Sequence, residues 1–243
     1  MRLPSHLRVL AFALLIGAVM IGPGLGLAQV NLRARVEVNK GGHRVKDASN
    51  AVIWLTPIGL AADPPQQQPS EIPRLVQKNK QFHPSLIVVP VGGKVEFPNR
   101  DPFFHNVFSL FEGERFDLGL YESGTTRFVQ FDKPGISYIF CNIHAEMSAV
   151  IIAVDTPYYG ISDARGEISL PSVPPGRYEL QVFHTSVAPD ALRTLKHEIT
   201  IAGDNTFIGS FTLSESDLHL VHKNKYGREY DRPDPDSPAY ARP

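Results

Sequence analysis

The chain is poor in sulfur and carries no excess of either charge. Its 243 residues include one cysteine, Cys141, so no disulfide can form within the chain. Twenty-four lysines and arginines stand against 25 aspartates and glutamates, without the cationic excess that neutralises phosphates. The motifs G-x-S-x-G, H-E-x-x-H and the phosphate-binding glycine loop are also absent. These absences argue against a nucleic acid partner and predict a protein that is not an enzyme.

Long helices are not expected either. Twenty-one prolines and 19 glycines interrupt every apolar run after the first thirty positions. Between these breakers lie short segments rich in β-branched and aromatic residues, each about as long as a strand. With 42% hydrophobic residues the chain can bury a substantial core, so we expect an all-β protein.

Residues 1–28 are expected to form a signal peptide. Arg2 and Arg8 precede an uncharged stretch from Val9 to Val30, in which a small residue, Ala28, precedes the expected cleavage point. The alternative is an uncleaved membrane anchor, since a run of more than about 18 apolar residues can span a bilayer. Both interpretations predict export, and we expect the mature chain in the periplasm.

The first expected strands lie in residues 29–60. Alternation runs through V-N-L-R-A-R-V-E-V from Val30 and resumes after Gly41-Gly42 as A-V-I-W-L, which ends at Leu55. This pattern predicts two antiparallel strands joined by a turn.

The rest of the mature chain divides into four parts. Residues 61–77 include a Pro/Gln-rich run that cannot lie within a sheet and predicts a linker. Six short strands separated by turns are expected within 78–156, a pattern typical of a sandwich or barrel. Further short strands follow in 157–215. Residues 216–243 are polar and Pro-rich, which predicts a mostly disordered tail.

Candidate metal ligands gather between His105 and Met147. Cys141, His144 and Met147 form C-N-I-H-A-E-M directly after the strand S-Y-I-F, and His105 begins another strand. One thiolate, two imidazoles and one thioether are the ligands of a trigonal His₂Cys copper site with a weak axial methionine. Soft sulfur ligands favour Cu(I), whereas imidazole suits both oxidation states, so the set predicts one-electron transfer. Zinc would more often recruit four strong ligands.

This region resembles a cupredoxin, the family of plastocyanin, pseudoazurin and amicyanin. F-H-P-S-L-I-V-V-P-V-G-G-K-V-E-F-P-N is similar to the opening strands, H-N-V to the segment of the first histidine, and G-I-S-Y-I-F-C-N-I-H-A-E-M to the ligand loop. The resemblance covers about residues 78–154 and implies a Greek-key β-sandwich with one type 1 (blue) copper ion. It implies that His105, Cys141 and His144 are equatorial ligands and that Met147 is axial.

Two further residues are expected around the ligands. The resemblance implies that Asn106 fixes the site through hydrogen bonds around the thiolate. Phe104, with Phe103 beside it, is expected to form an apolar collar that excludes water. The alternative is that both phenylalanines belong to the core.

The segments on either side resemble a different family. V-N-L-R-A-R-V-E-V-N-K-G-G-H-R-V-K-D-A-S-N-A-V-I-W-L and S-D-A-R-G-E-I-S-L-P-S-V-P-P-G-R-Y-E-L-Q-V are similar to the two halves of a carboxypeptidase regulatory-like, transthyretin-type β-sandwich. The resemblance implies that 29–60 and 157–215 form one split Ig-like sandwich into which the cupredoxin, 78–156, is inserted. The whole arrangement resembles periplasmic proteins labelled methylamine-utilisation or plastocyanin-like.

The resulting hypothesis is a periplasmic blue copper protein that carries single electrons between redox partners, such as a cytochrome and a dehydrogenase. The alternative is a non-redox binding or assembly module, or a copper carrier, in which the copper is structural or in transit. A third possibility is a degenerate cupredoxin that binds no metal.

Overall fold

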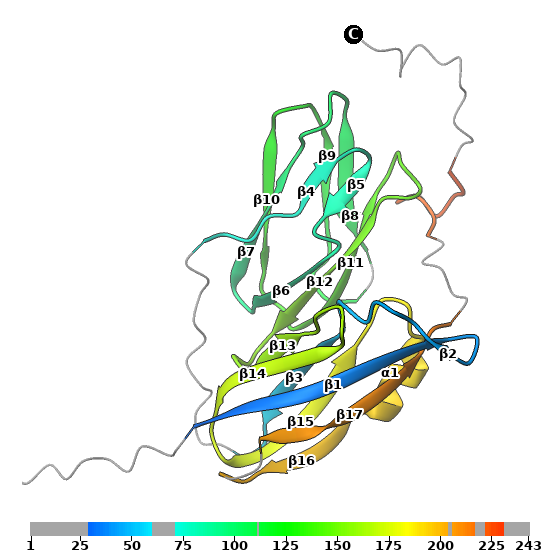
Figure 1. The fold of residues 1–243 in the computed structure, drawn as a ribbon. Coiled ribbons are helices and arrows are strands. Elements are labelled where there is room, and N and C mark those ends of the chain that lie inside the picture. The colour runs from blue at the N-terminus through cyan, green and yellow to red at the C-terminus, as the bar shows by residue number, and fades with distance from the viewer. Residues whose placement is uncertain (1–28, 60–70, 111, 204–205, 217–221, 231–243) are drawn as a thin grey trace, which may run out of the picture.

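The structure, a computed structural model, describes residues 29–59, 71–110, 112–203, 206–216 and 222–230. The expected signal peptide, most of the linker and the last part of the tail lie outside these residues. The described chain folds into strands β1 to β17 and one short helix, α1 (Pro189–Leu195), which confirms the all-β class (Figure 1). None of the described helices is long and apolar enough to cross a membrane.

Two sheets from the ends of the chain form a unit that we call the host sandwich (Figure 1). One sheet has the order β14-β1-β17, with β2 also paired to β1, and the other has the order β13-β3-β15-β16. The strands of the first sheet are β1 (Val30–Lys40), β2 (His43–Arg44), β14 (Glu167–Val173) and β17 (Phe207–Ser214). Those of the second are β3 (Val52–Pro57), β13 (Tyr159–Ile161), β15 (Gly176–Phe183) and β16 (His197–Ile201).

Strands β1 and β3 lie in different sheets, so the expected antiparallel pair is wrong. Gly41 and Gly42 form the expected turn, with φ angles of 55° and 82°, but the strand after it is β2, only two residues long. The chain then changes sheets, and β3 pairs with β13 and β15. All residues from Val52 to Leu55 are buried, so both faces of β3 are covered, whereas β1 alternates. A strand covered on both faces belongs in the middle of the molecule.

Residues 74–154 form a second unit, which we call the site domain. Its main sheet has the order β6-β12-β11-β8-β9, and two smaller sheets pair β7 with β10 and β4 with β5. Leu75 is fully buried in its core, so this domain begins inside the segment expected to be a linker. The strands are β4 (Val76–Lys78), β5 (Gln81–His83), β6 (Leu86–Pro90), β7 (Gly93–Pro98), β8 (His105–Ser109), β9 (Phe116–Tyr121), β10 (Thr126–Phe131), β11 (Gly135–Cys141) and β12 (Ser148–Val154).

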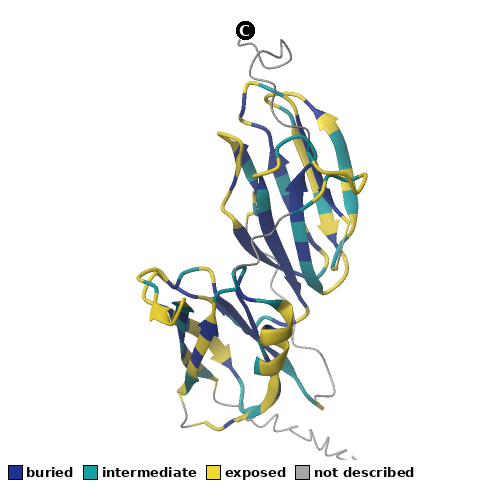
Figure 2. Ribbon diagram, turned by 90° about the vertical axis from the view of Figure 1, so that its right-hand side faces the viewer, coloured by how far each residue is buried: buried dark blue, intermediate teal, exposed yellow. Residues whose placement is uncertain are grey.

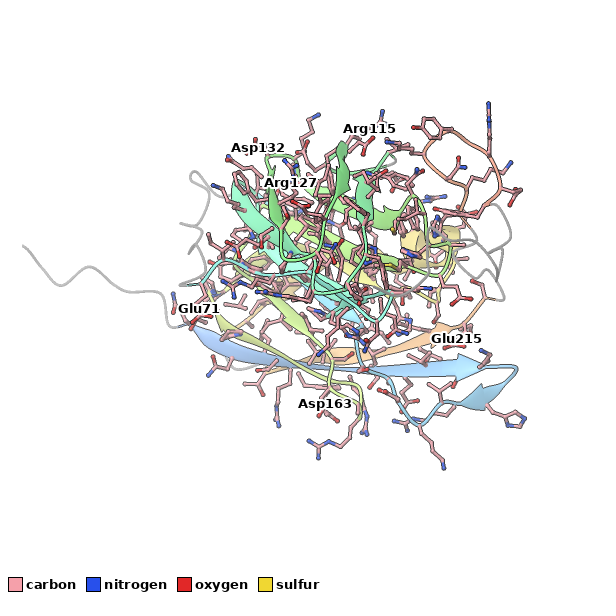
Figure 3. The ribbon with its side chains drawn as sticks, turned by 90° about the horizontal axis from the view of Figure 1, so that it is seen from above. Glu71, Arg115, Arg127, Asp132, Asp163 and Glu215 are labelled. Atoms are coloured by element: carbon pink, nitrogen blue, oxygen red, sulfur yellow. The ribbon has the colours of Figure 1, made fainter. Side chains whose placement is uncertain are left out.

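Strand β12 joins the cores of the two units. Ile151 belongs to the apolar cluster inside the site domain, whereas its neighbours Val150 and Ile152 belong to the cluster that also contains Leu55 and Leu170 of the host sandwich. Buried residues accordingly run through both units in Figure 2, and the six charged residues labelled in Figure 3 lie toward the outside of the molecule. Because one apolar cluster spans both units, the site domain is packed onto the host sandwich and not merely tethered to it.

Residues 222–230 of the expected disordered tail are ordered against the site domain, in orange-red in Figure 1. Tyr230 and Lys225 make hydrogen bonds to residues of the site domain. These long-range contacts, which no local sequence pattern encodes, supply the order that the polar composition alone does not predict.

Candidate metal centre

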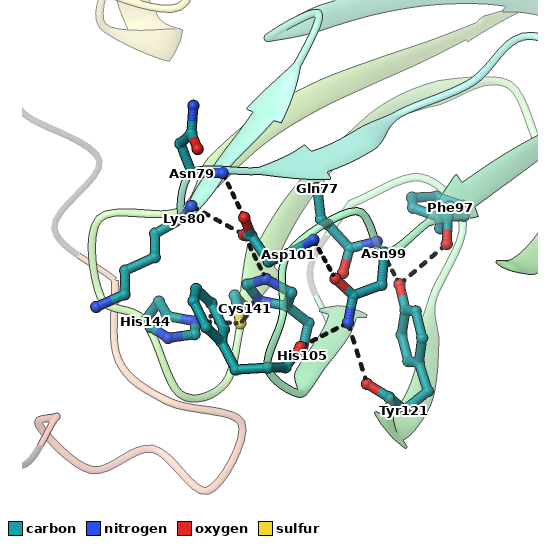
Figure 4. Close-up of polar contacts among 11 residues, drawn as sticks. Gln77, Asn79, Lys80, Phe97, Asn99, Asp101, His105, Tyr121, Cys141 and His144 are labelled. Carbon is teal, nitrogen blue, oxygen red and sulfur yellow. Dashed lines mark hydrogen bonds and ion pairs between the residues drawn. The ribbon is translucent and has the colours of Figure 1, made fainter. Parts of the chain in front are cut away.

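Three potential ligand atoms converge at one end of the site domain. The Sγ of Cys141 lies 3.5 Å from Nδ1 of His105 and 3.5 Å from Nδ1 of His144, and the two nitrogens are 3.2 Å apart (Figure 4). The centre of such a triangle lies about 2 Å from each corner, close to the usual metal–imidazole bond length. The residue types and the spacing of the three atoms therefore fit a single metal ion.

The sheet brings these residues together from distant parts of the sequence. His105 is the first residue of β8 and Cys141 the last of β11, and these strands are neighbours. The backbone N–H of Asn142 donates to the carbonyl oxygen of Asn106, 2.9 Å away, which fastens the ligand loop to β8.

The ligand loop turns back on itself after β11. Cys141 N–H donates to the carbonyl oxygen of Met147 at 3.2 Å, and Met147 N–H donates to that of His144 at 3.1 Å. Because the loop is closed in this way, His144 lies beside the cysteine that precedes it by three positions.

Asp101 orients the ring of His105. Its Oδ2 lies 2.9 Å from Nε2 of His105, and both residues are buried. A carboxylate accepts a hydrogen bond from Nε2–H, so Nδ1 carries no proton and its lone pair faces the sulfur. Asp101 was not among the residues expected at the site, although its place four residues before His105 is a signal that could have found it.

Asp101 is itself held by the backbone of the β4–β5 turn. The N–H groups of Asn79 and Lys80 donate to its carboxylate at 2.6 and 3.0 Å (Figure 4). Burial acts to raise the pKa of Asp101, but hydrogen bonds from Lys80, His105 and Asn79 outweigh it and lower that pKa below its usual value. Asp101 therefore stays ionised.

Both histidines are neutral near pH 7. Burial lowers the pKa of His105, although Asp101 opposes this effect. Burial, and after it the charges of His105 and Lys80, lowers the pKa of His144 to about 4. A metal ion binds the neutral imidazole, so few protons compete for these nitrogens at neutral pH.

The thiol of Cys141 is fully buried. Burial raises its pKa, while hydrogen bonds from the backbones of Asn106, Ile143 and His144 act in the opposite direction. Backbone donors that can stabilise a thiolate are therefore in place, and a metal ion would supply the charge that displaces the proton.

The residues expected around the ligands take different places. Asn106 approaches the sulfur through its backbone, whereas its side-chain amide donates to Oδ1 of Asp117 at 2.6 Å. Phe103 packs on both histidines, with ring centroids 5.3 Å from His105 and 5.5 Å from His144. Phe104 is 50% exposed. Phe103 alone therefore covers the two histidines, whereas Phe103 and Phe104 were both expected to do so.

Met147 is fully buried in the apolar cluster that also contains Cys141. Its backbone closes the ligand loop, as described above. The axial role of its sulfur stays a prediction.

Comparisons with known proteins relate part of the chain to copper proteins. No family model and no curated protein matches it. Similar solved structures include a purple cupredoxin from Nitrosopumilus maritimus, at 18% identity and a TM-score of 0.31 over 34% of this chain and 99% of that one. Amicyanin from Paracoccus versutus is 17% identical, with a TM-score of 0.33 over 35% of this chain and 84% of that one.

A copper-containing nitrite reductase from Thermus scotoductus SA-01 is 24% identical, with a TM-score of 0.33. The match covers 41% of this chain but only 25% of the reductase. The structural neighbours are thus cupredoxins over about a third of this chain, and the resemblance of the host sandwich to a carboxypeptidase regulatory-like domain stays a prediction.

Proposed function

We propose that this chain is a periplasmic electron carrier with one type 1 copper ion bound by His105, Cys141 and His144. The observation that carries the proposal is the convergence of two Nδ1 atoms and one Sγ at mutual distances of 3.2 to 3.5 Å. Two imidazoles and one thiolate form the trigonal set of electron-transfer copper sites. In this proposal Met147 is the axial ligand, and the chain catalyses no reaction of its own.

Copper supplies the one-electron couple when it is bound. The residues of the chain fix the positions of the ligand side chains. Asp101 fixes the ring of His105, the backbone holds the sulfur, and Phe103 packs on both rings. Ligands that are already in place before the metal binds need little rearrangement when the charge of the ion changes. Such a centre suits rapid electron exchange with a cytochrome or a dehydrogenase, the partners that we propose.

The test is to load the purified, exported chain with Cu(II) and record its absorption spectrum and voltammogram. We expect an intense visible thiolate-to-copper band and a reversible one-electron wave, both absent in Cys141→Ser. His144→Ala should also lose the intense band. The matched control is His197→Ala, which removes an exposed histidine of β16 in the host sandwich and should keep both signals.

Two other results would each favour another function. Ready exchange of Cu(I) with chelators, without a reversible wave, would indicate a copper carrier or a structural site. A melting temperature that Cu(II) leaves unchanged would mean that no metal binds specifically, because a ligand at 100 times its Kd stabilises a fold by about 2.7 kcal/mol.

A further inference from the structure

The C-terminal segment 222–230, which we call the strap, lies directly against the ligand loop. The hydroxyl of Tyr230 donates to the carbonyl oxygen of Cys141 at 2.7 Å. The backbone N–H of Lys225 donates to Oδ1 of Asn142 at 2.8 Å. The strap therefore holds two consecutive residues of the loop, one of them the cysteine whose sulfur lies at the metal centre.

A second connection runs from the strap to the ligand loop. Nζ of Lys225 lies 2.7 Å from Oδ2 of Asp117, and Oδ1 of the same carboxylate accepts the side-chain amide of Asn106 at 2.6 Å. The carbonyl oxygen of Asn106 in turn accepts the backbone N–H of Asn142, the residue after the cysteine, at 2.9 Å. Lys225 is thus connected to the ligand loop through the side chains of Asp117 and Asn106, independently of the contact that Tyr230 makes.

The strap folds into a turn that is held by its own backbone hydrogen bonds. Asn224 N–H donates to the carbonyl oxygen of Arg228, and Gly227 N–H donates back to that of Asn224, both at 2.9 Å. His222 stacks on Phe140, the residue before the cysteine, with ring centroids 3.9 Å apart. A turn with internal hydrogen bonds and a stacked ring can transmit a constraint to the loop beneath it.

We propose that the strap is a positioning element of the metal centre. It holds Cys141 and Asn142 in the conformation that presents the sulfur to the two histidines, and Tyr230 and Lys225 are its positioning residues. The proposal rests on the proposed function only for its copper measurements. Its measurements on the metal-free protein stand alone.

The first test compares two tyrosines in the full chain. Tyr230→Phe removes the hydroxyl that bonds to Cys141, and Tyr178→Phe removes one that donates to the carbonyl oxygen of Pro174 at 2.8 Å in the host sandwich. In the metal-free protein, Tyr230→Phe should speed the reaction of the buried thiol with a disulfide reagent about two- to tenfold, the effect of one hydrogen bond on a local opening. Tyr178→Phe should leave this rate unchanged.

The copper-loaded proteins give the second measurement. Tyr230→Phe should shift the visible thiolate-to-copper band, because the orientation of the sulfur governs that band, and Tyr178→Phe should not. A purely structural role for Tyr230 would lower stability without moving the band.

Lys225→Met is the second variant, since it removes the ion pair to Asp117 but keeps the backbone bond to Asn142. It should also speed the thiol reaction. If Tyr230→Phe and Lys225→Met both react at the wild-type rate, the proposal is overturned. If the wild type binds no copper yet the thiol rates rise as expected, the strap proposal stands and the proposed function fails.

Discussion

At the residue scale, one carboxylate decides how a candidate ligand meets the sulfur. Asp101 accepts hydrogen bonds from two backbone N–H groups and pairs with Nε2 of His105. Hydrogen bonds of this kind fix the tautomer and the ring orientation of a ligating histidine and raise its basicity. Asp101 therefore prepares His105 before any metal arrives.

Asp101→Asn should weaken metal binding about 10- to 100-fold, the usual cost of losing such a partner. The amide keeps the size of the side chain but replaces one acceptor oxygen with an NH₂ group that cannot accept a hydrogen bond from Nε2–H. Competition with a copper chelator would measure the change. Asp163→Asn is the matched control, because the side chain of Asp163 also accepts two backbone hydrogen bonds, in the host sandwich. An equal loss in both variants would contradict the prediction.

The sequence was sufficient to name the three residues whose ligand atoms converge. C-x-x-H after a strand and a distant histidine at the start of another strand are local patterns, and the sheet brings them together. The roles of Asp101 and Phe103 could be identified only from the structure, since their contacts depend on the path of the loop before β8 around His105. The role of Tyr230 could not be predicted from a local sequence pattern at all, because Tyr230 contacts a residue 89 positions away.

At the element scale, β12 serves two cores with its two faces. Ile151 and Ile152 are both fully buried, the first among residues of the site domain and the second in the cluster shared with the host sandwich. Alternation along the strand separates adjacent residues in this way. The same strand thus stabilises the metal centre and the contact between the two units.

Ile151→Ala and Ile152→Ala should each lower the free energy of unfolding by about 2–5 kcal/mol, the range for such deletions in a core. Because β12 belongs to both cores, we expect a single urea transition in both variants. The fluorescence of Trp54 reports on the host sandwich, and the reactivity of Cys141 reports on the site domain. Midpoints that differ between these two probes would show that the units unfold separately.

The elements that the sequence analysis missed have physical reasons in common. Strands β4 and β5 are three residues long, and β9 has one buried residue, so none of them shows a clear alternating pattern. Helix α1 has seven residues, fewer than a periodic signal needs. Most strands with a regular apolar face were expected, because their burial follows directly from the sequence.

At the scale of the whole molecule, four of the histidines that the structure describes are buried or half-buried, and burial favours their neutral form. Burial lowers the pKa of each of them: His105, His144, His184 and His222. Protonation of a buried imidazole favours the unfolded chain, in which the pKa has its usual value of about 6.5. The stabilising effect of the neutral form is therefore complete above pH 6.5 and is lost as the pH falls toward the folded-state pKa values.

The metal-free protein should accordingly lose stability as the pH falls from about 6.5 to 5, by at most about 1.4 kcal/mol per pH unit for each histidine. Urea unfolding at several pH values would measure this slope. His184→Gln, outside the metal centre, should reduce the slope without abolishing it. Stability that stays constant or rises on acidification would contradict the prediction.

The parallel pairing of β1 with β17 has a consequence for how the chain is made. Strand β1 ends at Lys40, but one of its two long neighbours is complete only at Ser214. All strands of the site domain lie between these points. A chain that emerges N-terminus first can therefore finish the site domain while its first strand still has an open edge, and this edge is where a second nascent copy would most readily attach.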